Sequence, residues 1–302
     1  MRIRLLAPAA AVVFLLGACS DQSPVADDGP TRGADRDTET PSGPSDSPAD
    51  SPTSAGSGGG ATVPAYFVGD TDRAGLRLYR EFQRVDGDPL EAATALLTSG
   101  SSLDPDYRTL FPGGAFESVE YSADAGAIIA TVPDDGWNTR APGMSVAEAK
   151  LAVQQLVYTL QGVQQERVPV VVQLGSSPVP LFGIDTTDGL TAAPPLDVLS
   201  HLSLTTPEQG SVDDDGTLEI SGVGNSFEAN IGCEIRRGDE VVLDGFATMA
   251  GWMEPRLFPF ETTADISDLP PGDYTLWATT DDPTGGTEGI GAMTDDKDFT
   301  VG

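Results

Sequence analysis

The chain has 302 residues, of which 47 are Asp or Glu and 16 are Lys or Arg, and its formal net charge at pH 7 is −31. So large a negative charge repels phosphate backbones and anionic lipid surfaces. Composition therefore excludes nucleic acid as a partner. Only Lys150 and Lys297 are lysines, so arginine carries nearly all of the positive charge.

The first residues predict an export signal that ends in a lipidation site. Two arginines precede an apolar stretch of about twelve residues, within the range of secretory signals and short of the roughly twenty needed to span a bilayer. Two small residues and then Cys19 follow. We predict that residues 1–18 are removed and that Cys19 carries the acyl chains (diacylglycerol, palmitate) of a lipoprotein. The alternatives are a chance cysteine after an ordinary signal, or a disulfide between Cys19 and Cys233.

Residues 19–60 predict a disordered tether. This stretch consists mainly of Ser, Pro, Asp, Gly and Thr and has no aromatic side chain, so it cannot bury enough apolar surface to offset the cost of ordering. A flexible chain of about 40 residues has an r.m.s. span of roughly 35 Å. Together with Cys19, it predicts a folded part held at the extracytoplasmic face of the cell membrane.

The ordered part begins with strand-like segments. Residues 61–69 and 75–85 predict two strands around a turn at Gly69-Asp70. The stretch "FESVEYSADAGAIIATVP" predicts a hairpin, with a return strand over residues 128–132. A last apolar run over residues 168–174 is rich in β-branched side chains and predicts another strand.

Two helices are predicted among these strands. In the first, Asp88, Pro89 and Glu91 supply an N-cap carboxylate, a first-turn proline and a capping-box glutamate, and Gly100 ends the helix near residue 98. In the second, "SVAE" opens the longest periodic apolar segment, residues 146–163. Residues 61–192 therefore predict an α+β domain with two helices on one face of a small sheet.

Residues 193–302 predict an all-β immunoglobulin-like sandwich. Short alternating segments are separated by Gly, Pro or Asp, and no helical period appears. Tyr274 in "LPPGDYTLWA" stands where a tyrosine corner would form, and Cys233 reads as a small buried hydrophobe in a strand. The predicted strands cover residues 201–205, 218–223, 227–235, 241–247, 257–264, 274–280 and 297–301.

The stretches "DPLEAATALLTSGSSLDPDYRTLFPGG", "AKLAVQQLVYTL" and "VPVVVQLG" resemble the GerMN domain of spore-germination and sporulation lipoproteins. The stretches "SGVGNSFEANI" and "PPGDYTLWATTDD" resemble the immunoglobulin-like (Gmad-type) module of bacterial spore germination. The resemblance implies an exported, membrane-anchored, non-catalytic protein. GerMN domains are similar to modules that build rings in envelope machines, so the resemblance also implies a role in assembly or self-association.

Catalytic motifs are absent from the sequence. It contains no HExxH, GxSxG, CxxC, P-loop or dinucleotide fingerprint, and we expect neither a cofactor nor an enzyme activity. A serine hydrolase would have to use His201, the single histidine, and Ser176-Ser177 has no base nearby in sequence. We expect His201 to lie at a solvent-exposed edge.

Acidic loops offer a weak candidate for calcium. Asp281, Asp282, Asp295 and Asp296 are predicted to flank the last loop of the sandwich, where four carboxylates could approach one another. Asp213-Asp214-Asp215 is a similar cluster. Their spacing matches no EF-hand, so solvated loops are the simpler interpretation.

Three tryptophans suggest contact surfaces. Trp137 lies in the loop-like stretch "PDDGWNTRAPG", and a ligand or partner would contact it together with Asp134, Asp135, Asn138 and Arg140. The alternative is an aromatic side chain that closes the edge of a core. Trp252 allows the same two interpretations, and Trp277 is a candidate for the interface between the domains.

The sequence leaves three functional hypotheses. The first is a surface-tethered scaffold that binds an envelope protein or associates with itself. The second is a module that binds cell-wall peptidoglycan or a small ligand around Trp137. The third is an enzyme of unrecognised type, whose activity would require His201 or a metal.

Overall fold

The computed structural model describes residues 60–252, 254–285 and 287–302. These residues belong to one compact unit, Ala49–Gly302. The predicted signal peptide, Cys19 and nearly all of the predicted tether lie outside the described residues. Within the described part, no helix combines the length and the apolar character needed to cross a membrane.

The first domain contains two sheets, where the sequence predicted one. β1 (Ala61–Thr71) and β2 (Gly75–Val85) pair only with each other as named strands, and their turn follows Thr71, not Gly69. A separate four-stranded sheet has the order β3-β4-β5-β6. Its strands are β3 (Ser118–Ser122), β4 (Ala127–Val132), β5 (Val170–Leu174) and β6 (Ser177–Pro178).

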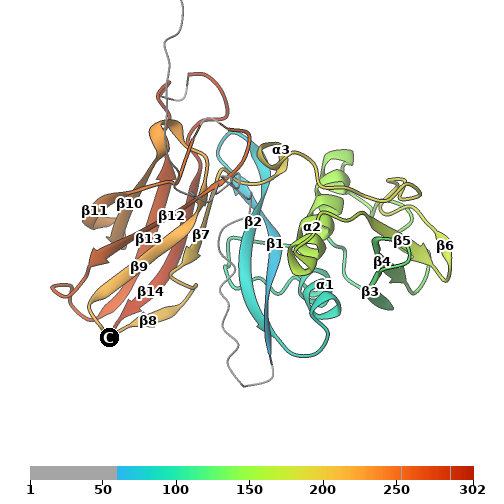
Figure 1. Ribbon diagram of the computed structural model, residues 1–302. Helices are drawn as coiled ribbons and strands as arrows, with labels where there is room; N and C mark the ends of the chain where they lie inside the picture. Colours follow the sequence, from blue (N-terminus) through green and yellow to red (C-terminus); the bar gives the residue numbers. More distant parts are fainter. Residues whose placement is uncertain (1–59, 253, 286) are drawn as a thin grey trace, which may run out of the picture. The chain divides into compact units, whose positions relative to one another are not determined.

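Both predicted helices are confirmed, and they lie between the two sheets (Figure 1). α1 (Pro89–Ser99) begins at Asp88, whose carboxylate accepts the N–H groups of its first turn, and ends at Gly100 in a left-handed conformation (φ 70°). α2 (Val146–Gln164) begins with a complete capping box between Ser145 and Glu148. Because α2 returns the chain to the starting end of the sheet, β4 and β5 pair in parallel.

One apolar core joins the helices to both sheets. Each of these elements contributes side chains that are fully buried: Phe67 from β1, Leu97 from α1, Ile128 from β4, Leu156 from α2 and Val170 from β5. The α+β class is therefore confirmed, with the helices forming a layer between the sheets.

The connection between the domains packs against the first domain. It contains one short helix, α3 (Pro195–Val198). Leu199 forms a parallel bridge with Leu78 of β2, and the Ser200 N–H donates to the Leu78 carbonyl (2.8 Å). The end of the linker is thus fixed against β2 just before the second domain begins at β7 (Leu202–Thr206).

The second domain is the predicted sandwich. One sheet has the order β11-β10-β13-β14-β8 and the other β12-β9-β7, and their inner faces share one core. The tyrosine corner is confirmed, since the Tyr274 hydroxyl donates to the Pro270 carbonyl (2.7 Å). The strands are β7 (Leu202–Thr206), β8 (Ser211–Asp213), β9 (Thr217–Gly224), β10 (Asn230–Arg237), β11 (Glu240–Thr248), β12 (Phe258–Asp265), β13 (Gly272–Thr280) and β14 (Thr294–Val301).

Three details of the sandwich differ from the prediction. The strand predicted to start at Phe227 starts at Asn230, because Phe227–Ala229 forms a 3-10 turn with Glu228 at φ 55°. The short strand β8 was not predicted, and it pairs in parallel with β14. β14 begins at Thr294, three residues before the predicted strand, which moves Asp295 and Asp296 from the loop into the sheet.

Candidate functional site

Trp137 is part of an aromatic cluster at the edge of the first domain's core. Its ring centroid lies 5.0 Å from that of Phe116, 5.5 Å from that of Phe111 and 6.2 Å from that of Phe182. The indole Nε1–H donates to the Gly113 carbonyl (3.2 Å). Trp137 therefore closes the core, which is the simpler of the two interpretations offered by the sequence.

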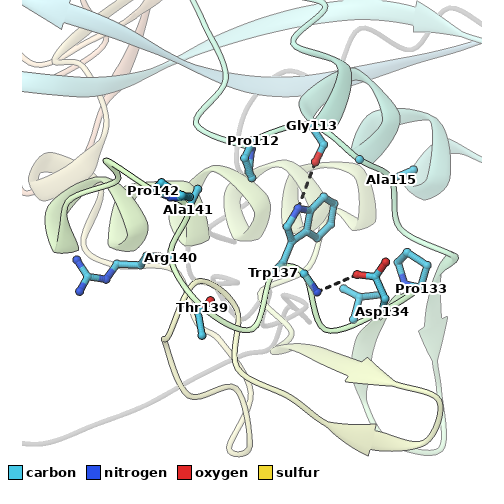
Figure 2. Close-up of a pocket in the computed structure, with 13 residues that line it drawn as sticks. Pro112, Gly113, Ala115, Pro133, Asp134, Trp137, Thr139, Arg140, Ala141 and Pro142 are labelled. Carbon is cyan, nitrogen blue, oxygen red and sulfur yellow. Dashed lines mark hydrogen bonds between the residues drawn. The ribbon is translucent and has the colours of Figure 1, made fainter.

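The exposed side of this cluster borders a cavity of about 380 Å³ between the loop after α1 and the loop after β4 (Figure 2). Trp137, Asp134 and Arg140 all line it. The Asp134 carboxylate accepts the Gly136 N–H (2.8 Å), and the Arg140 guanidinium donates to the Met144 carbonyl (3.3 Å). Figure 2 shows the Arg140 side chain directed away from the indole, so these three groups do not converge on one point.

The other two predicted contacts lie elsewhere. Asp135 and Asn138 do not line the cavity. The Asn138 main-chain carbonyl accepts the Gly183 N–H (3.1 Å), and its Oδ1 is buried without a hydrogen-bond partner in the described structure. Asn138 therefore contributes to loop structure. The cavity is lined by the Trp137 indole, the Asp134 carboxylate and the Arg140 guanidinium, which face different directions.

A second cluster of polar side chains is buried between the domains. Asp104 and Tyr107 come from the loop after α1, and Asp295 and Lys297 come from the inner face of β14. All four are between 3% and 6% exposed. Buried charges are rare unless they are paired, so this cluster is the most unusual chemical feature of the described residues.

Direct contacts hold the cluster together. Lys297 Nζ donates to Asp104 Oδ2 and to the Tyr107 hydroxyl (3.1 Å). The Tyr107 hydroxyl donates to Asp295 Oδ1 (2.5 Å), and the Leu204 N–H of β7 donates to Asp295 Oδ2 (2.6 Å). The Tyr107 ring also stacks on Tyr79 of β2, at 4.8 Å between centroids.

Burial governs the protonation of these groups. Desolvation raises the pKa of Asp295 to about 6, although Lys297 and the hydrogen bond from Tyr107 oppose it. Burial would lower the pKa of Lys297, but the carboxylates of Asp295 and Asp104 outweigh burial and raise it. Burial and the same two carboxylates raise the pKa of Tyr107 well above its ordinary value.

The four aspartates that were weak candidates for calcium do not come together in the described residues. In the described residues, no group of three or more His, Cys, Asp or Glu side chains is arranged to hold a metal ion. Asp295 is buried in β14, and both of its carboxylate oxygens accept protein hydrogen bonds. The carboxylates of Asp281, Asp282, Asp295 and Asp296 therefore do not form a shared site.

The alternation of "TDDKDFTV" contained a signal for the interface. It places Asp295 and Lys297 on the same face as Phe299 and Val301, which belong to the sandwich core. This signal did not enter the sequence-based prediction, because the predicted strand started at Lys297 and left Asp295 in the loop.

The remaining candidates have structural roles. His201 is partly buried, not at an exposed edge; its Nε2 lies 3.0 Å from the Leu196 carbonyl oxygen, and desolvation lowers its pKa. Burial raises the pKa of the Cys233 thiol to about 11, so this side chain behaves as a small hydrophobe. Trp277 lies under the Arg236 guanidinium (4.5 Å) on the outer face of β13.

Trp252 is 40% exposed, and its ring meets the exposed Phe227 ring edge to face at 5.8 Å. Phe227 leaves the core because it lies in the 3-10 turn before β10. The pair is part of the outer surface of the sandwich.

Comparison with known families identifies both domains. Residues 64–178 match the family described as "Sporulation and spore germination", and residues 201–287 match the "Immunoglobulin-like domain of bacterial spore germination". A comparison with curated proteins found no match. The chain therefore carries a sporulation and spore germination domain followed by an immunoglobulin-like domain of bacterial spore germination.

Proposed function

We propose that this protein is a lipid-anchored scaffold on the outer face of the cell membrane, and that its two domains present binding surfaces to an envelope partner without catalysing a reaction. The observation that carries the proposal is the buried interface between the two germination-related domains. Domains that share buried, hydrogen-bonded side chains keep a fixed geometry, as a scaffold requires.

Cys19 supplies the anchor in this proposal. Each buried CH₂ of an acyl chain contributes about 0.8 kcal/mol, and stable anchoring takes more than one chain. A diacylated cysteine meets that requirement. The tether of about 40 residues then allows the folded domains to reach roughly 35 Å from the headgroups.

Fractionation of cells tests the anchor. We expect Cys19→Ala to move the protein from the membrane fraction to the medium with both domains folded. Cys233→Ala is the matched control, because it removes the other cysteine and should leave the protein in the membrane fraction. A Cys19→Ala protein that stays membrane-bound would contradict the proposal.

The edge strand β11 is the surface that we propose for the partner. Among the described strands it pairs only with β10, and its Val241 and Phe246 side chains are 45% and 68% exposed. An unpaired edge can add a strand from another protein through main-chain hydrogen bonds.

Photo-crosslinking in cells tests this surface. We expect a photoreactive phenylalanine analogue at position 246 to give a discrete adduct, and the same analogue at the exposed Tyr121 of the first domain to give none. Adducts from position 121 alone would assign the contact to the other domain. No adduct at either position would argue against a scaffold that docks through these faces.

A second candidate function is binding of cell-wall fragments in the cavity beside Trp137, supported by the indole, carboxylate and guanidinium that line it. Titration with soluble muropeptides distinguishes the two functions, because the scaffold predicts no saturable binding. If binding occurs, Arg140→Ala should abolish it and the exposed Arg256→Ala should not. Trp137→Ala is less informative, since Trp137 also packs against three phenylalanines.

A further inference from the structure

Lys297 is an unexpected residue for a buried ion pair in this chain. The chain uses arginine at nearly every basic position, and Lys150 and Lys297 are the only lysines among 16 basic residues. A guanidinium fork would satisfy a buried carboxylate better than an ammonium does. What an ammonium offers, and a guanidinium does not, is a primary amine that becomes a nucleophile once it loses a proton.

We propose that Lys297 and Asp104 condense to an intramolecular isopeptide bond, which links the immunoglobulin-like domain covalently to the sporulation domain. Lys297 Nζ contacts Asp104 Oδ2, and both side chains are buried between the domains. No other molecule is required, because the two reacting groups belong to one chain and water is the only by-product.

The condensation begins with a proton transfer within the ion pair. The ammonium transfers one proton to Asp104, which leaves a neutral amine beside a neutral carboxylic acid. The amine attacks Cγ of Asp104, and a bond forms between Nζ and Cγ. The bond between Cγ and Oδ2 then breaks, and Oδ2 leaves as water with two of the three ammonium protons.

Asp106 and Glu81 hold the electrophile in place. The Asp106 N–H donates to Asp104 Oδ1 (2.9 Å), so it faces the oxygen that gains negative charge when the amine attacks. The Glu81 carboxylate accepts the N–H groups of Asp104 (2.8 Å) and Leu103 (3.0 Å), which fixes the loop. Asp104 Oδ2 is left to face the amine.

Tyr107 and Asp295 provide a path for the second proton. Lys297 Nζ donates to the Tyr107 hydroxyl (3.1 Å), and this hydroxyl donates to Asp295 Oδ1 (2.5 Å). Asp295 Oδ1 also lies 3.8 Å from Nζ. A carboxylate here accepts the proton from the attacking nitrogen and returns it to the leaving oxygen, so Asp295 is unchanged at the end.

Burial favours the product. An ion pair taken out of water loses solvation that its mutual attraction does not fully replace. Condensation converts the two buried charges into one neutral amide. The released water leaves a site in which all four side chains are almost fully covered, and hydrolysis would require water to return.

Peptide mapping tests the isopeptide bond between Lys297 and Asp104. The full-length protein is extracted in detergent, denatured and digested with trypsin. We expect residues 85–108 joined to residues 257–302, with a combined mass lower by one water than the two peptides. Cleavage after Lys297 should be blocked. Recovery of unlinked 85–108 and 257–297 as the main species would overturn the proposal and leave an ion pair.

Three variants locate the chemistry. Lys297→Arg keeps the charge and should abolish the linked peptide, whereas Lys150→Met, at the other lysine, should leave it at the wild-type level. Asp295→Asn keeps the size of the side chain, and we expect it to raise the unlinked fraction. Wild-type linkage in Asp295→Asn would overturn the proton path through Asp295. The peptide map of the wild-type protein shows whether the isopeptide bond forms, and this test does not depend on whether any variant folds.

Discussion

Trp137 determines which residue can stand opposite its ring. Gly114 has φ 107°, and a Cβ built there would lie 2.8 Å from Trp137 Cζ2. We expect Gly114→Ala to lower the free energy of unfolding by roughly 2–4 kcal/mol, because it adds backbone strain and a clash within the aromatic cluster. Urea denaturation measures this difference.

Gly143→Ala is the matched control for Gly114→Ala. Gly143 has φ 88°, but a Cβ there would meet nothing within 4 Å. Its substitution should cost only the backbone term, about 1 kcal/mol. If both variants lose the same free energy of unfolding, the contact with Trp137 does not contribute to the loss in Gly114→Ala.

Asp295 gives the molecule an unusual dependence on pH. Burial raises its pKa to about 6, whereas an unfolded chain releases this proton near pH 4. Between these values the folded state holds a proton that the unfolded state has lost, so the free energy of unfolding falls as pH rises through this window. Across this window, Asp295 lowers the free energy of unfolding by on the order of 3 kcal/mol.

Comparison with Asp295→Asn isolates this effect from other carboxylates. The stability of wild type minus that of the variant should decrease between pH 4 and pH 7. Asp296 contributes in the same direction, since burial and then Asp106 raise its pKa to about 6. A difference that stays constant or grows with pH would contradict the protonation state assigned to Asp295.

The capping box shows how one element is fixed by its first turn. Ser145 Oγ accepts the Glu148 N–H (3.1 Å), and the Glu148 carboxylate accepts the Ser145 N–H (2.8 Å). Ser145→Ala should cost about 1 kcal/mol of stability, and Ser145→Gly only a few tenths. Thermal unfolding checks the order of the two variants, and an equal loss in both would mean that the side-chain cap is not what stabilises this end.

Elements with local signals were predictable from the sequence. Both helices begin at their predicted capping residues because caps are formed by neighbours in the chain. The tyrosine corner of Tyr274 is equally local. The division of the first domain into two sheets was not predictable, because alternation shows that a strand exists but not which strand it pairs with.

The two candidate sites also differ in how close together their residues lie in the sequence. The loop around Trp137 is contiguous, so three of its five predicted residues do line one cavity. The interface cluster combines Asp104 with Lys297, which lie 193 residues apart in the sequence. A single strand pattern can place Lys297 on an inner face but cannot supply the loop that meets it.

At the scale of the whole molecule, carboxylates dominate the interface. Glu81, Asp104, Asp106, Asp295 and Asp296 surround or adjoin one lysine. The contact between β2 and β7 adds two hydrogen bonds, from the Arg80 N–H to Ser203 Oγ (3.2 Å) and from Ser203 Oγ–H to the Arg80 carbonyl (3.3 Å). In the ion-paired state, the Lys297 ammonium therefore offsets the repulsion that would otherwise separate the domains, and condensation with Asp104 would remove one of the repelling charges.

Calorimetry tests whether the coupling of the two domains depends on Lys297. The wild-type protein should unfold in a single transition, because the buried interface couples the domains. Lys297→Met removes the proposed cross-link and leaves Asp104 and Asp295 buried without a cation. An unpaired buried charge costs roughly 3–5 kcal/mol, so this variant should show two transitions. Lys150→Met, on the exposed side of α2, should melt as the wild type does. Two transitions in the wild-type protein would mean that the domains are stable separately and that Lys297 does not couple them.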